Sequence, residues 1–465
     1  MTIEQSVAEP QSEEALDLYR LSYDSPILAR QQQQESNARS YPRRIPLALT
    51  RAHGIYVEDV EGRTFIDCLA GAGALVLGHN HPAVISAIRG VLDSGLPLLT
   101  LDLTTPVKDK FVQDLFFLLP ASFRSQAKIQ FCGPSGTDAV EAALKLVRTA
   151  TGRSTMLSFQ GAYHGMSQGA LSLMGNLAPK NPQAAILSNN VQFLPYPNDF
   201  RCPFGLGGEA GIKANLHYLE SLLTNPESGV PLPAGVIIEV IQGEGGVIPA
   251  DIEWLRGLRR ITKETGVPLI VDEIQSGFAR SGTMFAFEQA GIVPDVVVLS
   301  KAIGGSLPLA VIVYREELDQ WQPGAHAGTF RGNQMAMAAG SAVMEYLAQE
   351  NLASHAAAMG ERLLRHLREL QTTCPSLGDV RGRGLMVGVE IVDPGGKPDA
   401  QGHPPPSGQL AALIQRECLV RGLILELGGR FGSVVRFLPP LIITAAEIDR
   451  VVEIFSRAVA VALDH

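Results

Sequence analysis

The sequence predicts an α/β protein with a seven-stranded, mostly parallel sheet in a large domain and a smaller α+β domain formed from both chain ends. Seven short apolar runs rich in β-branched residues lie between residues 128 and 315, and amphipathic segments of helix length separate several of them. Alternating hairpin patterns flank this region on both sides. Strands that alternate with helices favour a doubly wound parallel sheet buried on both faces.

Size and composition set the broad class. The chain has 465 residues, of which 46% are hydrophobic and 18% charged, and this suits a globular protein of about two to three domains. The net charge of −9 argues against non-specific nucleic-acid binding. No apolar run approaches a transmembrane helix, and the acidic start of the chain lacks the apolar core of a signal peptide. Five scattered cysteines without disulfide or zinc spacing fit a reducing cytoplasm and give no metal site.

The N-terminal part begins with a polar arm over residues 1–44, in which residues 13–20 could form a helix. Two short alternating runs between residues 47 and 69 then predict an antiparallel hairpin, and Pro82 is placed to start a helix. His79 and His81 lack further ligands at metal spacing, so we expect turn or structural roles for them.

The central part contains the seven predicted strands. They are KIQFC (128–132), STMLSF (154–159), VQFLPY (191–196), GVIIEV (235–240), PLIVD (268–272), DVVVLS (295–300) and LAVIVY (309–314). Amphipathic segments at 138–150 and 251–265 predict helices between them.

The C-terminal part predicts helices at 333–347 and 355–370, then further strands and helices interrupted by a Gly/Pro loop at 394–408. The composition of this loop suits a surface insertion rather than a core. We expect residues 101–339 to form the large domain and residues 45–100 with 340–465 to form the small one.

Two charged residues end neighbouring predicted strands, Asp272 after LIV and Lys301 just beyond VVVL. The ends of such strands are where open α/β sheets bind ligands. Burying either charge alone costs several kcal/mol, roughly, so each needs a partner or a chemical task.

Other strand ends contribute to the same edge of the sheet. Ser135, Gly136 and Thr137 open a helix after the first strand and could cradle a phosphate, although helix capping explains the same residues. Tyr163 could stack on a planar ligand or fill the core, and Glu244 follows the fourth strand among glycines.

The whole set suits pyridoxal phosphate (PLP) catalysis. A lysine binds the cofactor's aldehyde, a carboxylate keeps the pyridine nitrogen protonated, and burial favours the neutral amine that attacks aldehydes. In this interpretation Asp272 and Lys301 bind the same cofactor, which accounts for two charged residues at one edge of a buried sheet.

Several motifs together resemble the class III PLP-dependent aminotransferases over roughly residues 45–460. The motifs are SGTDAVEAALKL, GAYHG, QGEGGV, VDEIQSGFARSG, GTFRGN and RFLPPL, with a lysine 29 residues after Asp272. The resemblance implies fold-type I and a cofactor-binding, proton-carrying Lys301. It also implies that Gln275 lies near the phenolic oxygen of the ring.

The resemblance further implies that Tyr163 stacks on the ring and that Gly136 and Thr137 hold the phosphate. Thr329 would complete the phosphate site of a neighbouring subunit, which implies a homodimer or a tetramer of two such dimers. Arg436 would bind a substrate carboxylate as a planar, bidentate guanidinium, and Glu244 would neutralise it when an ω-amine donor occupies the site.

Segments such as GHNHPAV, LTLDLTTPVKDKF and TFRGNQMAMAAG resemble the branch of this family that moves the terminal amino group between L-2,4-diaminobutyrate and 2-oxoglutarate, often in siderophore biosynthesis. Ala72 stands at about the position where ornithine-specific members of the family carry a tyrosine. This difference weakens the case for ornithine as the amino donor. Other ω-amine donors (ornithine, 4-aminobutyrate, lysine), an aminomutase, a decarboxylase and a catalytically silent regulatory protein remain alternatives. We expect amino-acid and 2-oxo-acid partners, with no nucleic acid and no membrane.

Overall fold

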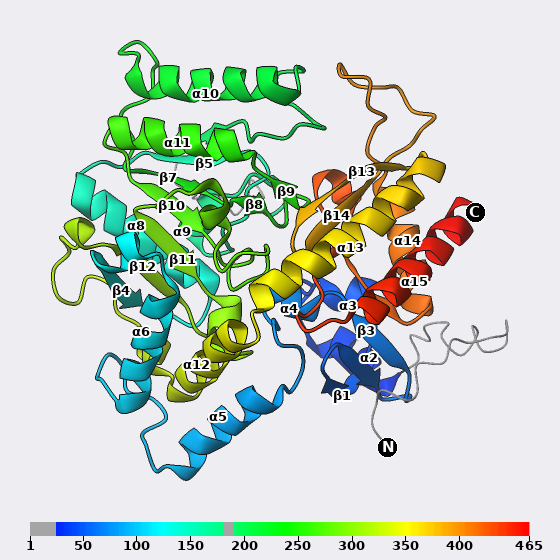
Figure 1. The fold of residues 1–465 in the computed structure, drawn as a ribbon, viewed down its shortest axis with the longest axis horizontal. Coiled ribbons are helices and arrows are strands. Elements are labelled where there is room, and N and C mark those ends of the chain that lie inside the picture. The colour runs from blue at the N-terminus through cyan, green and yellow to red at the C-terminus, as the bar shows by residue number, and fades with distance from the viewer. Residues whose placement is uncertain (1–24, 181–189, 465) are drawn as a thin grey trace.

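The computed structural model describes residues 25–180 and 190–464, and Figure 1 shows how its elements are arranged. The helix expected at residues 13–20 lies outside the described residues. Within the predicted arm, the described part contains two short helices, α2 (Pro26–Gln34) and α3 (Tyr41–Arg44). No helix among the described residues combines the length and apolarity that crossing a bilayer requires.

A seven-stranded sheet forms the centre of the larger part of the molecule, in the order β4-β12-β11-β10-β7-β5-β6. Its strands are β4 (Ala127–Phe131), β5 (Met156–Phe159), β6 (Val191–Leu194), β7 (Gly235–Ile238), β10 (Leu269–Asp272), β11 (Val296–Leu299) and β12 (Val311–Arg315). Each predicted run contains one of these strands or overlaps it. Strand β12 runs antiparallel to both β11 and β4, whereas the pairs from β11 to β6 are parallel. The predicted seven-stranded, mostly parallel sheet is confirmed.

The sheet is buried on both faces because apolar side chains alternate along its strands. On β7, Val236 and Ile238 join a core that includes Trp254 of α11 (Ile252–Glu264), whereas Ile237 joins a second core with Val140 of α8 (Gly136–Thr151). Successive strand residues point to opposite faces, so α8 and α11 cover opposite sides of the sheet.

Local signals in the sequence fix several helix starts. Pro82 occupies the first turn of α5 (Pro82–Asp93), and Asp251 caps α11 by accepting the amide hydrogens of Glu253 and Trp254. The other helices between residues 45 and 350 are α4 (Ala70–Gly73), α6 (Pro106–Leu118), α7 (Ala121–Arg124), α9 (Gln168–Ser172), α10 (Gly208–Thr224) and α12 (Gln334–Gln349).

Three smaller sheets complete the fold. The first has the order β1-β2-β3-β15, the second β13-β14-β17-β16, and β8 pairs with β9. Their strands are β1 (Leu49–His53), β2 (Tyr56–Asp59), β3 (Thr64–Asp67), β8 (Ile241–Gln242), β9 (Ile248–Pro249), β13 (Leu377–Arg383), β14 (Met386–Ile391), β15 (Leu423–Ile424), β16 (Glu426–Gly428) and β17 (Val434–Phe437). The helices of the C-terminal part are α13 (Leu352–Thr373), α14 (Gly408–Val420) and α15 (Ala445–Leu463).

The two chain ends meet in the first of these sheets. β15 pairs in parallel with β3, so that Leu423 lies opposite Ile66 and Ile424 opposite Asp67. We propose that the small domain consists of residues 45–100 and 340–465. Helix α12 crosses position 340 without a break and packs against both α5 and α6, so this helix would connect the two domains.

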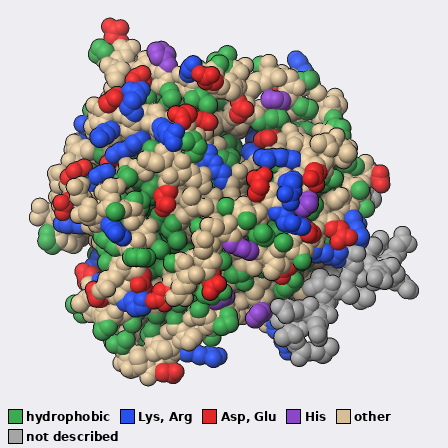
Figure 2. Space-filling view, in the orientation of Figure 1, with side chains coloured by type: hydrophobic (Ala, Val, Ile, Leu, Met, Phe, Trp, Pro, Cys, Tyr) green, Lys and Arg blue, Asp and Glu red, His purple; other side chains and the backbone are tan. Residues whose placement is uncertain are grey.

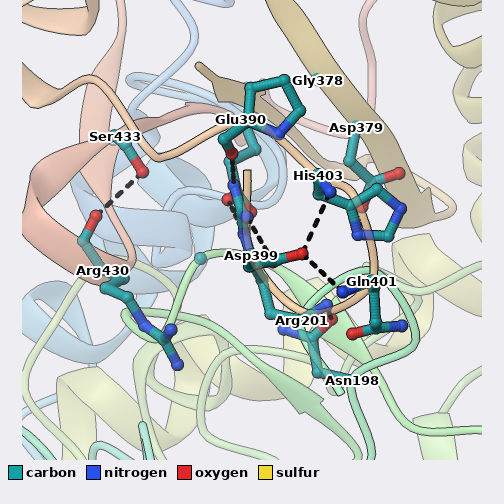
Figure 3. A network of polar contacts seen from close by, with 12 residues as sticks. Asn198, Arg201, Gly378, Asp379, Glu390, Asp399, Gln401, His403, Arg430 and Ser433 are labelled. Atoms are coloured by element: carbon teal, nitrogen blue, oxygen red, sulfur yellow. Dashed lines mark hydrogen bonds and ion pairs between the residues drawn. The ribbon is translucent and has the colours of Figure 1, made fainter. Parts of the chain in front are cut away.

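Polar contacts hold the Gly/Pro-rich loop that precedes α14 (Figure 3). Arg201 donates to Glu390 at 2.9 Å and to Asp399 at 2.8 Å, and it also donates to the backbone oxygen of Pro404. The other oxygen of Glu390 accepts from Arg381, which donates in turn to the backbone oxygen of Gly246 at 2.8 Å. The loop is therefore linked through two arginines to the turn that carries Glu244.

Candidate active site

A cavity of about 290 Å³ lies at the carboxyl ends of the parallel strands. Asp272 is the last residue of β10, and Lys301 follows β11 by two positions. The wall of the cavity contains eight of the ten site residues predicted from the sequence: Ser135, Gly136, Thr137, Tyr163, Glu244, Asp272, Gln275 and Lys301. This is the edge at which open α/β sheets place their ligands.

Lys301 sits in the cavity wall in a strained backbone conformation. Its φ is +51°, in the left-handed region that non-glycine residues seldom adopt and that clusters at functional sites. Burial lowers the pKa of its ammonium group, partly offset by the carboxylate of Glu244. The net lowering of its pKa suits a lysine whose neutral amine reacts.

Asp272 is held by hydrogen bonds on both carboxylate oxygens. Nδ1 of His164 lies 2.8 Å from Oδ2, and the backbone amide of Ile274 donates to Oδ1 at 3.0 Å. His164 is buried, and its Nε2 has no hydrogen-bond partner among the described residues. The imidazole therefore fixes the direction of the carboxylate that faces the cavity.

Glu239 is a site residue that the sequence analysis did not select. It follows β7, is buried, and accepts the backbone amides of Tyr163 and Gly243, each at 2.9 Å. Burial raises the pKa of its carboxyl to about 7, although the nearby His164 lowers it. A charged residue ending a buried strand, the signal that marked Asp272, would also have marked Glu239.

The predicted phosphate cradle forms the N-terminus of α8. Ser135 donates through both its backbone amide and its hydroxyl to Asp138, which is a capping arrangement. A Cβ on Gly136 would lie 2.8 Å from the Ile274 side chain, so no larger residue fits there without movement. Thr137 is hydrogen-bonded to Ser167.

Arg436 lies behind the cavity wall and joins two residues of that wall. Fully buried on β17, it donates to Glu244 at 2.7 Å and to the side-chain oxygen of Gln275 at 2.9 Å. The amide nitrogen of Gln275 donates to the backbone oxygen of Ala72 at 2.9 Å. Burial disfavours the charge on Arg436, but Glu244 and Glu426 outweigh it and raise its pKa. Burial raises the pKa of the Glu244 carboxyl, but the interaction with Arg436 brings that pKa below its ordinary value.

Thr329 and His79 lie outside the cavity. Thr329 is exposed in a short 3₁₀ turn (Thr329–Gly332) and does not line the cavity. His79 lies 2.8 Å from Asp67 through its Nε2, which is the structural role expected for it. Residues 25–180 and 190–464 contain no group of three or more histidine, cysteine or acidic side chains suited to a metal ion.

Comparison with known proteins places this site in a family. The model of the family described as aminotransferase class-III matches residues 37–459. A diaminobutyrate–2-oxoglutarate aminotransferase of Rhizobium meliloti is 60% identical over 94% of this chain and 92% of its own. A protein of the same name from Haemophilus influenzae is 53% identical over 95% of this chain and 97% of its own.

Solved structures share the architecture. A PLP-bound amine transaminase from an uncultivated Pseudomonas species has a TM-score of 0.82 at 27% identity and covers 92% of this chain and 98% of its own. An engineered thermostable omega transaminase has a TM-score of 0.83 at 26% identity, over 94% and 99% of the two chains.

The fold is that of the fold-type I PLP-dependent transferases, as the resemblance implied. The chain belongs to the class III aminotransferase family.

Proposed function

We propose that this aminotransferase uses pyridoxal 5′-phosphate to move the terminal amino group between L-2,4-diaminobutyrate and 2-oxoglutarate, giving aspartate 4-semialdehyde and glutamate reversibly. The names of the relatives with 60% and 53% identity support the substrate pair. The observation that carries the proposal is the ion pair of Arg436 and Glu244 at the cavity that contains Lys301.

The residues of the cavity fit the cofactor. Lys301 would hold its aldehyde carbon, Asp272 its pyridine nitrogen, and the start of α8 at Gly136 and Thr137 its phosphate. Close contact at Gly136 leaves backbone rather than side chain at that helix start, as phosphate binding requires. When bound, PLP supplies an aldehyde that takes up amino groups and a ring that withdraws electrons.

The side chains of this chain carry the remaining tasks. Lys301 would remove the proton from the substrate carbon, and its lowered pKa makes the neutral amine available. Asp272, fixed by His164, keeps a positive charge at the ring nitrogen favourable. Glu239 positions the backbone of Tyr163, which would lie against the ring.

The Arg436–Glu244 pair gives the pocket two states. With an ω-amine donor bound, Glu244 neutralises Arg436, as in the structure. When 2-oxoglutarate binds, its carboxylate takes the bidentate position on the guanidinium and Glu244 is displaced. One pocket thereby serves both substrates.

A donor screen with 2-oxoglutarate tests the proposal. Glutamate formation from diaminobutyrate should exceed formation from ornithine, 4-aminobutyrate or lysine, and the Lys301→Ala variant should lose turnover while keeping its fold by circular dichroism. Preference for another donor would refute the substrate assignment alone. Wild-type turnover by Lys301→Ala, or a purified protein without PLP absorbance, would refute the aminotransferase mechanism.

We also propose that the enzyme is a cytoplasmic homodimer, alone or paired into a tetramer, with Thr329 reaching the phosphate site of the partner. The exposure of Thr329 away from its own cavity supports this arrangement. Mixing Thr329→Ala with Lys301→Ala chains tests it, because mixed dimers would combine both lesions in one site and leave the other site intact. Activity of the mixture above that of either variant alone would support shared sites, and purely additive activity would exclude them.

A further inference from the structure

Glu426 is a buried carboxylate beside the Arg436–Glu244 pair that neither the motifs nor the proposed mechanism uses. It opens β16 and lies directly opposite Arg436 on β17 in the antiparallel register. The residue is 7% exposed. Its position is therefore set by a strand pair of the C-terminal sheet rather than by a mobile loop.

The carboxylate of Glu426 is incompletely satisfied. Its Oε2 lies 3.4 Å from Nη1 of Arg436, and among the described residues no hydrogen bond reaches this oxygen. The same Nη1 already donates to Glu244 at 2.7 Å. The hydroxyl of Tyr41 hydrogen-bonds the Glu426 carboxyl and does not supply a positive charge.

Two carboxylates share the guanidinium of Arg436. The closer of them, Glu244, takes its shortest hydrogen bond, and the Lys301 amine acts on both carboxylates from the cavity side. A buried anion without a full counter-charge is unfavourable and is completed either by a proton or by a cation from outside. Burial raises the pKa of Glu426, although Arg436 lowers it.

The charge of Glu426 also acts on the reaction centre. The carboxylate of Glu426 influences the ionisation of both Lys301 and Tyr163, which line the cavity. A donor whose terminal amine reacts at Lys301 would extend its far end toward this cluster, where Arg436 is already occupied by Glu244.

We propose that Glu426 binds the α-ammonium group of the amino donor and so selects α,ω-diamino acids over ω-amino acids without that group. The inference rests on the proposed function and names the residue that sets its donor preference. Diaminobutyrate and 4-aminobutyrate share the reacting amine, chain length and carboxylate and differ only in this ammonium group. Oε2 of Glu426, which accepts no hydrogen bond among the described residues, would give that ammonium a charge-assisted acceptor.

The acceptor half of the reaction makes the opposite demand, because 2-oxoglutarate brings carboxylates and no ammonium. A permanently ionised Glu426 would repel it from Arg436. A carboxyl that takes up a proton when no cation is present avoids this repulsion, so one side chain serves both substrates.

The Glu426→Gln substitution tests the proposal because it removes the charge and keeps the shape. We measure kcat/KM for diaminobutyrate and for 4-aminobutyrate in wild-type and variant enzymes. The ratio of the two should fall about 10- to 100-fold in the variant, as expected for loss of a hydrogen bond to a charged group. The KM for diaminobutyrate should rise more than kcat falls. Calorimetric binding of both donors in the Lys301→Ala background should show the same change in the ratio of dissociation constants.

Matched variants keep the result interpretable. Glu426→Asp retains the charge and should restore part of the selectivity, and Glu417→Gln, an ion-paired carboxylate on α14, should leave the ratio unchanged. If kcat/KM falls equally for both donors in Glu426→Gln, Glu426 only supports Arg436 and the proposal is overturned. The proposal is also overturned if neither kcat/KM changes. A wild-type enzyme that prefers 4-aminobutyrate would overturn both this inference and the diaminobutyrate assignment. A wild-type preference for diaminobutyrate that survives Glu426→Gln would overturn this inference alone.

Discussion

We predict that the buried carboxyl of Glu239 makes the stability of the protein depend on pH. The Glu239→Gln substitution should reveal this dependence. Burial raises its pKa from 4.5 to about 7 in the folded protein. A raised pKa means that Glu239 contributes most stability when protonated, and that this contribution is lost as the pH rises from about 4.5 through about 7. The full loss is about 3 kcal/mol, because each pKa unit corresponds to about 1.4 kcal/mol.

Glutamine mimics the protonated carboxyl and cannot ionise. It has one acceptor oxygen, so one of the amides of Tyr163 and Gly243 loses a good partner, which costs about 1–3 kcal/mol at every pH. The free energy of unfolding of the wild type should therefore exceed that of the variant most at low pH. The difference should shrink, or change sign, as the pH rises toward 8.

Urea unfolding of the cofactor-free protein at pH 5, 6.5 and 8, at one protein concentration, measures this difference directly. The exposed Glu209, paired with Lys213 at 2.6 Å, provides the control, because a raised pKa is absent there and Glu209→Gln should not reproduce the trend. A difference between wild type and Glu239→Gln that stays constant across this pH range would refute the reasoning.

Three further substitutions test packing and the polar network. Gly136→Ala places a Cβ 2.8 Å from Ile274 and should destabilise by about 1–3 kcal/mol while weakening PLP binding in an absorbance titration. Gly90→Ala, in open space on α5, should instead stabilise by about 0.5–1 kcal/mol and leave PLP binding unchanged. Glu390→Gln removes the shared negative charge that faces Arg201 and should cost about 3 kcal/mol in urea unfolding, whereas a cost below 1 kcal/mol would show that the network adds little.

Much of the fold could be predicted because its signals are local. The β-branched runs are too short for helices and too apolar for exposed strands, and they mark the seven central strands. The direction of β12 could not be predicted, because LAVIVY carries the same apolar pattern as its parallel neighbours. Strand direction is decided by the length and path of the connection, which hydrophobic periodicity does not record.

The site was predictable where a residue stands at a strand end or in a specific motif. The cavity therefore brings together Lys301, Asp272 and their predicted neighbours, whose individual roles remain predictions. His164 contacts Asp272, which is distant in the sequence, and Glu426 meets Arg436 through the register of β16 on β17. Such pairings follow from how strands pack in space, and a single sequence does not contain them.

The pairing of β3 with β15 affects how the chain folds as it is synthesised. Because β3 pairs with β2 on one edge and finds its second partner only at Leu423, the N-terminal hairpin keeps that edge open until nearly the whole chain has left the ribosome. An unpaired edge invites association with other chains. A message truncated before residue 423 would thus yield an aggregation-prone fragment rather than a weakened enzyme. Supply of chaperones during synthesis should accordingly control the yield of active protein.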